Sequence, residues 1–246
     1  MLILSWNVAG LTTTLQRINA DYSVGTENKE SKSMPSSSKG ATFLANYFKL
    51  HQADIICLQE HKISLSSIKN RNEPFSCCTS TPGYESFWSC CVDPTKRGFN
   101  GVCTFAKQGT TILADNSILG DKDLDDQGRC IMTDHGAFVL FNVYVPALGG
   151  QSLSYKMRFL KALRRAMKTK RDVEGRHVIL VGDLNIAHTK EDVLWCSRMV
   201  DIDQIITEVS DSNAGSDIPP WKLDVYHHWD NIASALETKR VSTLVW

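Results

Sequence analysis

The stretch His177–His188, HVILVGDLNIAH, decides the fold because an apolar strand in it runs directly into polar side chains. Four apolar residues, 178–181, are followed at once by Gly-Asp-Leu-Asn, in which Asp183 and Asn185 stand two positions apart. A strand that is buried on both faces is a nearly unbroken apolar run, so its end is the first place where it can offer a polar side chain. The stretch therefore predicts a buried strand that presents Asp183 and Asn185 at the rim of a sheet.

Three other apolar strands follow the same rule. LILSWN ends at Asn7, ADIICLQE ends at Glu60, and FVLFNVYVP carries Asn142 and Tyr144. Asp and Asn commonly end strands because they start turns, so any one of these cases has a structural explanation. Four cases together favour a shared rim, at which a Glu, an Asp and several carboxamides meet, over a coincidence of turns.

The oxygen-rich set expected at this rim suits Mg²⁺, with Mn²⁺ as a substitute, because these ions prefer carboxylate, carbonyl and water ligands. The expected metal-site residues are Asn7, Glu60, Asp183 and Asn185. Magnesium held by few carboxylates is commonly used to attack phosphate esters. In such a site Asp183 would accept a proton from the attacking water, Asn185 would stabilise charge developing on the phosphate oxygens, and Tyr144 would hydrogen-bond the phosphate.

The rest of the sequence predicts a single α/β domain over residues 1–246. Residues 19–40 are polar and rich in serine, which is typical of a flexible insert with little to bury. The remaining expected elements are a helix around residues 43–48, two antiparallel strands in 83–92 and 100–107, two more in 128–135 and 137–146, and an amphipathic helix over 154–170. No repeat or linker is visible, so mixed antiparallel strands with flanking helices indicate an α/β or α+β sandwich.

Charge and cysteine usage limit the classes of partner. Lys+Arg and Asp+Glu number 27 each among 246 residues, so any binding of nucleic acid must come from a local patch. Eight cysteines without zinc-binding spacing favour free thiols in a reducing compartment. Neither a signal peptide nor an apolar run of about 18 residues is seen, so we expect an intracellular protein with no membrane partner.

Basic residues at one turn are the first candidates for contacts with a phosphate backbone. Lys96 and Arg97 lie in DPTKRG, the expected tip between two strands, where an exposed basic loop costs little to present. Nine further basic residues lie between Lys156 and Arg176. These are explained first as the solvated face of the amphipathic helix, and DNA contact is the alternative.

The ordered motifs of the chain resemble the exonuclease III class of apurinic/apyrimidinic endonucleases, within the endonuclease, exonuclease and phosphatase superfamily. The resemblance covers about residues 1–190, and the motifs that carry it are SWNVAGL (5–11), LQEHK (58–62), GR (128–129), NVYVP (142–146) and GDLNIAH (182–188). The polar insert after WNVAGL and the segment KMRFLKAL after NVYVP are more similar to the second eukaryotic subtype than to the first.

This resemblance implies a four-layer α/β sandwich that acts in base excision repair. It implies a monomeric, Mg²⁺-dependent nuclear enzyme that cuts double-stranded DNA 5′ to abasic sites, with 3′–5′ exonuclease and 3′-phosphodiesterase activity at blocked 3′ ends. By position, Asn7 and Glu60 look like metal-site residues, and Tyr144 looks like the phosphate-contacting tyrosine. Asp183 is similar to the water-activating aspartate, and Asn185 to the transition-state stabiliser. Arg129, in the GR motif, is a further candidate for DNA contact.

The chain departs from the family pattern at three places. Ala9 stands where relatives have an acidic residue near the metal, and Ala147 where they often have a DNA-contacting polar side chain. The family's final aspartate and Ser-Asp-His motif are not found before Trp246; Thr133-Asp134-His135-Gly136 precedes NVYVP and reads as an ordinary hairpin turn. We therefore expect a C-terminally truncated product that lacks its last strands.

Two alternative functions remain open at this point. One is a catalytically impaired product that only binds DNA or a repair partner, because the final Asp and His are not found. The other is a superfamily relative that acts on a different phosphoester, such as RNA or a phosphoinositide.

Overall fold

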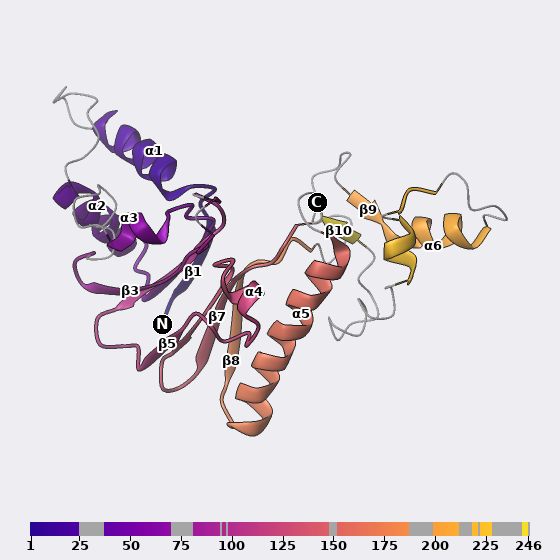
Figure 1. The fold of residues 1–246 in the computed structure, drawn as a ribbon. Coiled ribbons are helices and arrows are strands. Elements are labelled where there is room, and N and C mark those ends of the chain that lie inside the picture. The colour runs from indigo at the N-terminus through magenta and orange to yellow at the C-terminus, as the bar shows by residue number, and fades with distance from the viewer. Residues whose placement is uncertain are drawn as a thin grey trace. The chain divides into compact units, whose positions relative to one another are not determined.

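The computed structural model describes residues 1–24, 37–69, 81–93, 95–96, 98–147, 152–186, 199–211, 218–220, 222–227 and 243–245. The chain forms two compact units. The first comprises Met1–Tyr144 and Thr169–Asp183, and the second comprises Val145–Lys168 and Leu184–Trp246. The strands of the first unit and the helices beside them can be followed in Figure 1.

The first sheet of this unit has the strand order β1-β2-β4-β3. Its strands are β1 (Ile3–Asn7), β2 (Ile55–Gln59), β3 (Tyr84–Ser89) and β4 (Val102–Lys107). The β1–β2 pair is parallel, whereas β4 runs antiparallel to both β2 and β3. Each of these strands lies where its apolar run predicts one.

The second sheet has the order β5-β6-β7-β8. Its strands are β5 (Leu113–Asp115), β6 (Cys130–Asp134), β7 (Val139–Tyr144) and β8 (Val178–Asp183). The last pair, β7–β8, is parallel, and the other two pairs are antiparallel. The strands expected in 128–135, 137–146 and 177–185 are confirmed. The predicted burial on both faces is wrong for β1 and β8, which are only partly buried because they are the edge strands of their sheets. No pattern in the sequence indicates β5, because three residues are too few for a hydrophobic period.

The two sheets pack face to face, and β2 shows how the core is divided. Ile55 and Cys57 join a cluster with Leu140 of β7, between the sheets. Ile56 and Leu58 point to the other face, because side chains alternate along a strand, and there they join the cluster formed with the helices. This arrangement confirms the predicted α/β sandwich with two mixed sheets.

Helices cover the outer face of the first sheet. They are α1 (Leu11–Val24) and α2 (Ser37–Leu50), with the short α3 (Leu65–Lys69) following β2. Leu11, Leu15, Leu44 and Phe48 are buried in the shared cluster. Helix α4 (Lys122–Asp125) lies between β5 and β6.

The insert expected over 19–40 overlaps two helices at its ends, and its flexibility stays a prediction. Helix α1 continues to Val24 and α2 begins at Ser37, while residues 25–36 lie outside the described part. Leu11 and Leu15 anchor the first turns of α1, and once a helix is nucleated each further residue adds one hydrogen bond at low cost. The polar composition of the segment therefore did not prevent it from continuing the helix.

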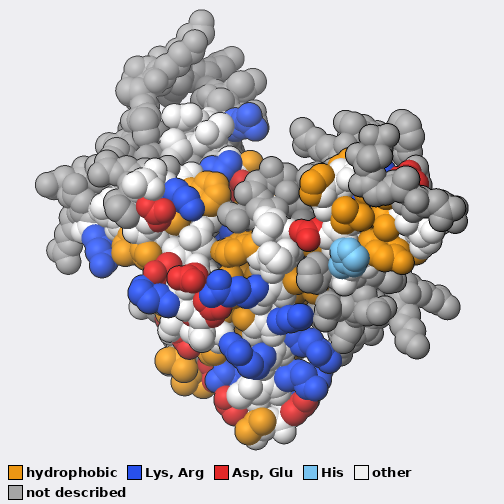
Figure 2. All heavy atoms as spheres, turned by 45° about the vertical axis from the view of Figure 1, so that its right-hand side comes forward, with side chains coloured by type: hydrophobic (Ala, Val, Ile, Leu, Met, Phe, Trp, Pro, Cys, Tyr) orange, Lys and Arg blue, Asp and Glu red, His pale blue; other side chains and the backbone are white. Residues whose placement is uncertain are grey.

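The second unit contains α5 (Leu153–Lys168), α6 (Ile202–Asp211) and the antiparallel pair β9 (Met199–Asp201) and β10 (Thr243–Val245). The amphipathic helix predicted over 154–170 corresponds to α5. Of its predicted apolar stripe, Phe159, Leu160 and Leu163 are buried, whereas Met167 is half-buried. Lys and Arg side chains gather on one face of the molecule in Figure 2, and the exposed basic residues of α5 are Arg158, Lys161, Arg165 and Lys168.

A π-helical turn (Thr169–Val173) follows α5 and belongs to the first unit. Among the described residues, no helix is both long and apolar enough to span a membrane.

Candidate functional site

Two parallel strand pairs bring the predicted polar strand ends to one rim. In the first sheet Asn7 lies in register with Gln59, so β1 and β2 end side by side and Glu60 follows directly. In the second sheet Tyr144 lies in register with Asp183 at the ends of β7 and β8. Parallel neighbours end at the same edge, whereas antiparallel neighbours would have sent these ends to opposite edges.

The side-chain amide of Asn7 joins the two carboxylates of the rim. Its Nδ2 donates to Glu60 Oε1 at 2.8 Å and to Asp183 Oδ2 at 2.8 Å. Its Oδ1 accepts the backbone N–H of Ala9 at 2.9 Å, which fixes the amide with its nitrogen toward the carboxylates. The convergence expected for Asn7, Glu60 and Asp183 is therefore present.

Glu60 has further partners that favour its ionised form. Lys62 Nζ lies 3.1 Å from Glu60 Oε2, and Tyr144 is hydrogen-bonded to the same carboxylate. Burial alone would raise the pKa of Glu60, but the hydrogen bonds from Asn7, Lys62 and Tyr144 outweigh it and lower the pKa below its ordinary value. Glu60 is thus held as an anion at neutral pH.

Tyr144 is held as a neutral phenol beside these anions. Burial, together with the nearby Glu60 carboxylate, raises the pKa of Tyr144 to about 12. Arg129 lies against the same ring, with its guanidinium carbon 4.7 Å from the ring centroid, and donates to the Tyr144 carbonyl at 3.2 Å. The hydroxyl group therefore keeps its proton and remains a hydrogen-bond donor.

The loops that carry these groups have an unusual backbone. Ala9, Glu60, Lys62 and Asn185 all have positive φ, at 48°, 55°, 56° and 50°. A non-glycine residue in the left-handed region costs of order 1–3 kcal/mol and persists only where surrounding contacts hold it. Such residues gather at functional sites, and here they are Glu60 itself and the residues two positions after Asn7, Glu60 and Asp183.

His61, between Glu60 and Lys62, is a buried residue that was not among the predicted site residues. Its ring is 1% exposed, Nδ1 accepts the Ile63 N–H at 3.0 Å, and Nε2 lies 3.3 Å from the Ser89 carbonyl. Burial lowers the pKa of His61 to about 4, so the ring is neutral. A Cβ at Gly101 would lie 2.3 Å from the ring, and only that distant glycine could have signalled a buried imidazole.

The backbone geometry at position 182 explains why a glycine precedes Asp183. Its φ is +131°, and a Cβ there would lie 2.0 Å from the carbonyl oxygen of Val143 on the neighbouring strand. The backbones of β7 and β8 therefore approach closely at the last residue pair before Tyr144 and Asp183. Glycine at this position allows the carboxylate to leave the sheet at the rim.

Asn142 was expected at the rim and is found inside the core. It is 0% exposed, and its Oδ1 accepts from Gln59 Nε2 of the other sheet at 2.7 Å. Asn142 points to the same side of β7 as Tyr144 but lies two residues deeper, so it faces the opposite sheet rather than solvent. The predicted cluster of carboxamides at the rim therefore lacks Asn142.

Asn185 belongs to the second unit and follows Asp183 by two residues. Its Nδ2 donates to the Val145 carbonyl at 2.8 Å, and its own carbonyl accepts from Lys156 Nζ at 2.7 Å. Its expected roles at the metal and at the transition state stay predictions.

The predicted DNA contacts differ in their surroundings. Lys96 is exposed, 3.8 Å from Asp93 Oδ2, with Nζ 5.7 Å from the Phe99 ring centroid. Arg97 lies outside the described residues. Arg129 is 4% exposed, between the Tyr144 and Phe99 rings, so its expected contact with DNA stays a prediction.

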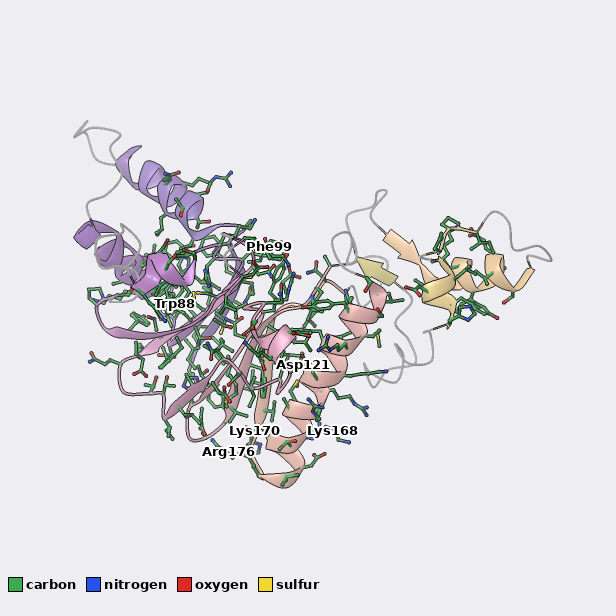
Figure 3. All side chains as sticks on the ribbon, in the orientation of Figure 1. Trp88, Phe99, Asp121, Lys168, Lys170 and Arg176 are labelled. Carbon is green, nitrogen blue, oxygen red and sulfur yellow. The ribbon has the colours of Figure 1, made fainter. Side chains whose placement is uncertain are left out.

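Phe99 is an exposed aromatic residue near these cations that sequence reasoning did not select. Its side chain is 40% exposed. Figure 3 labels Phe99 at the end of the sheets opposite to Arg176. A phenylalanine beside a glycine-rich turn carries no specific signal of function, which is why it was missed.

Asp134, part of the apparent Asp-His motif, lies at the other end of the second sheet. It pairs with Val139 at the start of β7, which in turn pairs with Val178 at the start of β8. Its carboxylate is bound by Arg176 at 2.7 and 2.5 Å. Asp134 and Asp183 are thus separated by the length of the sheet, in keeping with a structural turn at His135.

The residues at the rim fit a hard divalent cation with few protein ligands. Within the part of the chain that the structure describes, no three His, Cys, Asp or Glu residues form a metal-binding group. Glu60 and Asp183 are brought together by one amide, and Mg²⁺ commonly binds one or two carboxylates and completes its shell with water and phosphate oxygens. The nitrogen of Asn7 faces the carboxylates, so a ligand role for its oxygen stays a prediction.

Several curated proteins are similar to this chain. DNA-(apurinic or apyrimidinic site) endonuclease 2 of Mus musculus is 29% identical over 221 residues, which cover 76% of this chain and 38% of that protein. Recombination repair protein 1 of Drosophila melanogaster is 29% identical over 193 residues, covering 78% and 23%. The chain therefore spans well under half the length of these curated relatives.

Solved structures agree with this result. The catalytic domain of Xenopus laevis APE2 matches with a TM-score of 0.56 and 25% identity, covering 77% of this chain and 60% of that one. The AP endonuclease of Leishmania major, at 23% identity and a TM-score of 0.56, supports the fold alone. Residues 4–230 match the endonuclease/exonuclease/phosphatase family as a whole. The chain belongs to the endonuclease/exonuclease/phosphatase family, as its motifs at Asn7, Glu60 and Asp183 indicate.

Proposed function

We propose that this chain is a divalent-metal-dependent DNA phosphodiesterase of base excision repair, which cleaves double-stranded DNA 5′ to abasic sites. The observation that carries the proposal is the bond pattern of Asn7, whose nitrogen holds the Glu60 and Asp183 carboxylates together at 2.8 Å each. The family of the chain and the names of its relatives support the same substrate class.

The residues of the rim have separate roles in phosphodiester hydrolysis. Asp183 accepts the proton of the attacking water, because its half-buried carboxylate is held in place by the Asn7 amide. Tyr144, a neutral phenol, donates its hydrogen bond to a non-bridging phosphate oxygen in place of the Glu60 carboxylate, and Asn185 stabilises the charge that develops there. Mg²⁺ or Mn²⁺ held by Glu60 and Asp183 would offset negative charge on the phosphate and the leaving oxygen.

Contacts with the DNA backbone come from the turn between β3 and β4. Lys96 and Arg97 bind phosphates, and the exposed Phe99 ring stacks on an unpaired base or a sugar next to the abasic site. The remaining expectations belong to the same proposal: 3′–5′ exonuclease and 3′-phosphodiesterase activity at blocked 3′ ends, a monomeric enzyme, and a nuclear location.

The direct test is cleavage of an end-labelled duplex with one abasic-site analogue. We expect a single nick 5′ to the analogue with Mg²⁺, none in the intact duplex, and none with excess chelator. Asp183→Asn keeps the shape of the side chain but removes the base, so it should lower the rate about 10²–10⁴-fold while leaving DNA affinity nearly unchanged.

Two other outcomes would contradict the proposal in different ways. Tight binding of the abasic duplex without a nick, at saturating Mg²⁺ or Mn²⁺, would indicate a protein that only binds DNA or a repair partner. Cleavage of RNA or of a phosphoinositide in preference to abasic DNA would indicate a relative with another phosphoester substrate.

A further inference from the structure

Lys156, in the first turns of α5, is a fully buried lysine. Its side chain is 0% exposed, although lysine is almost never buried completely unless its ammonium group is paired. Nζ donates to the carbonyl oxygen of Asn185 at 2.7 Å, across 29 residues of chain. Both residues belong to the second unit, so the contact lies within one compact body.

Asn185 is held at two points and has a constrained backbone. Its φ is 50°, in the left-handed region that favours glycine. The side-chain nitrogen donates to Val145, at 2.8 Å, while the main-chain oxygen is bound by Lys156. A residue in this conformation stays there only when neighbouring contacts hold it, and these two bonds act on opposite ends of the same residue.

Burying the Lys156 ammonium group costs desolvation free energy, so the filling of space does not by itself explain a lysine at this position. A methionine would fill nearly the same volume without removing an ammonium group from water. The anchoring of α5 does not depend on Lys156, because Phe159, Leu160 and Leu163 are buried on the same helix. The hydrogen bond to the Asn185 carbonyl pairs the ammonium group and restrains the position of that carbonyl.

We infer that Lys156 is a positioning residue that sets the main-chain conformation of Asn185 and thereby aims its side chain. Lys156 touches no reacting atom in this scheme and acts only through Asn185. The inference rests on the proposed function, in which Asn185 stabilises charge on the phosphate oxygens. Misplacement of such a group by about 1 Å can lower the rate about 10²-fold.

The test compares Lys156→Met and Lys156→Arg with Leu163→Ala in the full chain. Leu163→Ala loosens the same helix but leaves the Lys156 ammonium group in place, so it controls for general destabilisation. With a saturating abasic duplex, we expect Lys156→Met to lower kcat about 10²-fold with little change in KM. Lys156→Arg should recover part of the loss, because it can still donate to the carbonyl.

A double-mutant cycle separates positioning from a structural role. In the Asn185→Ala background the Lys156→Met change should have almost no further effect on kcat, because the side chain that Lys156 aims is already absent. An unchanged kcat in Lys156→Met, or an equal loss in both backgrounds, would overturn the inference. So would a loss no larger than that of Leu163→Ala at equal stability.

A readout without catalysis keeps the inference separate from the proposed function. Amide hydrogen exchange over residues 183–186 should become faster in Lys156→Met and stay slow in Lys156→Arg. If wild-type protein fails to nick abasic DNA, the proposed function fails, and the exchange experiment still decides whether Lys156 orders Asn185. Unchanged exchange in Lys156→Met would refute the positioning role whatever the activity.

Discussion

The side chains of Gln59 and Asn142 bind each other across the two sheets, with Gln59 Nε2 2.7 Å from Asn142 Oδ1. Asn142 Nδ2 also donates back to the first sheet, to the Cys103 carbonyl at 2.9 Å. Both side chains are at most 1% exposed. This buried pair ties the strand that precedes Glu60 to the strand that ends at Tyr144, so it sets how the two halves of the rim are aligned.

Replacing one member of this pair should destabilise the protein more than replacing both. Asn142→Leu leaves the Gln59 amide without its Asn142 acceptor and removes the donor to the Cys103 carbonyl, so the free energy of unfolding should fall by about 2–4 kcal/mol. The double variant with Gln59→Leu removes both polar groups and should recover part of the loss. Urea unfolding measures both, and strictly additive losses would show that the two amides are not coupled.

Asn7→Ala should weaken metal binding because it removes the donor shared by Glu60 and Asp183. The two carboxylates would then repel each other and lose their fixed separation, and the pKa of Glu60 should rise toward its ordinary value. We expect about 10-fold or more Mg²⁺ for half-maximal nicking of abasic DNA. Thr14→Ala, a change outside the cluster, serves as the control, and an equal metal requirement in both variants would contradict the role assigned to Asn7.

Gly182→Ala should disrupt the rim, and Gly109→Ala provides a matched control. A Cβ at Gly182 meets the Val143 carbonyl at 2.0 Å, whereas a Cβ at Gly109, which also has positive φ, meets nothing within 4 Å. The control should cost about 1 kcal/mol from backbone strain alone, and Gly182→Ala about 2–4 kcal/mol with a large loss of cleavage. Thermal unfolding and cleavage assays test this, and equal effects would exclude a special role for the close approach.

The rim could be predicted from the sequence because apolar runs mark where strands end, although β1 and β8 are only partly buried. Asn7, Glu60, Tyr144 and Asp183 each follow such a run, and the structure brings them together. Asn142 lies within the same kind of run, but sequence does not distinguish a strand end from a position two residues deeper. Its partner, Gln59, is 83 residues away in the chain, which local patterns cannot reveal.

Other features depend on contacts between distant segments and could not be read from local sequence. The space for His61 exists because Gly101, on another loop, has no side chain. The buried charge of Lys156 looks in sequence like one more basic residue on an amphipathic helix. Polar composition likewise suggested a loop where α1 continues to Val24, because anchoring by distant core residues can override local preference.

Lys96→Gln should weaken DNA binding equally for abasic and intact duplexes. A lysine that neutralises one phosphate releases about one counterion, so its loss should reduce the slope of log K against log salt by about 0.9. Lys122→Gln is the control, because that side chain on α4 is 83% exposed and paired with Asp126, the residue that follows the helix. Fluorescence anisotropy over a salt series gives both slopes. Identical slopes for the two variants would show that Lys96 does not contact a DNA phosphate.

The Asp134–Arg176 pair should stabilise the protein in a pH-dependent way without affecting the rim. Hydrogen bonds from Arg176 lower the pKa of Asp134 below its ordinary 3.8, so the stabilisation is fully present above that value and is lost as pH falls through the lowered pKa. At neutral pH, Arg176→Gln should reduce the free energy of unfolding, and the difference from wild type should shrink as the solution is acidified toward pH 2. Denaturant unfolding across this range measures it, and a difference that stays constant with pH would contradict the assigned cause. Cleavage at neutral pH should be unchanged, because Asp134 lies at the end of the sheet opposite to Asp183.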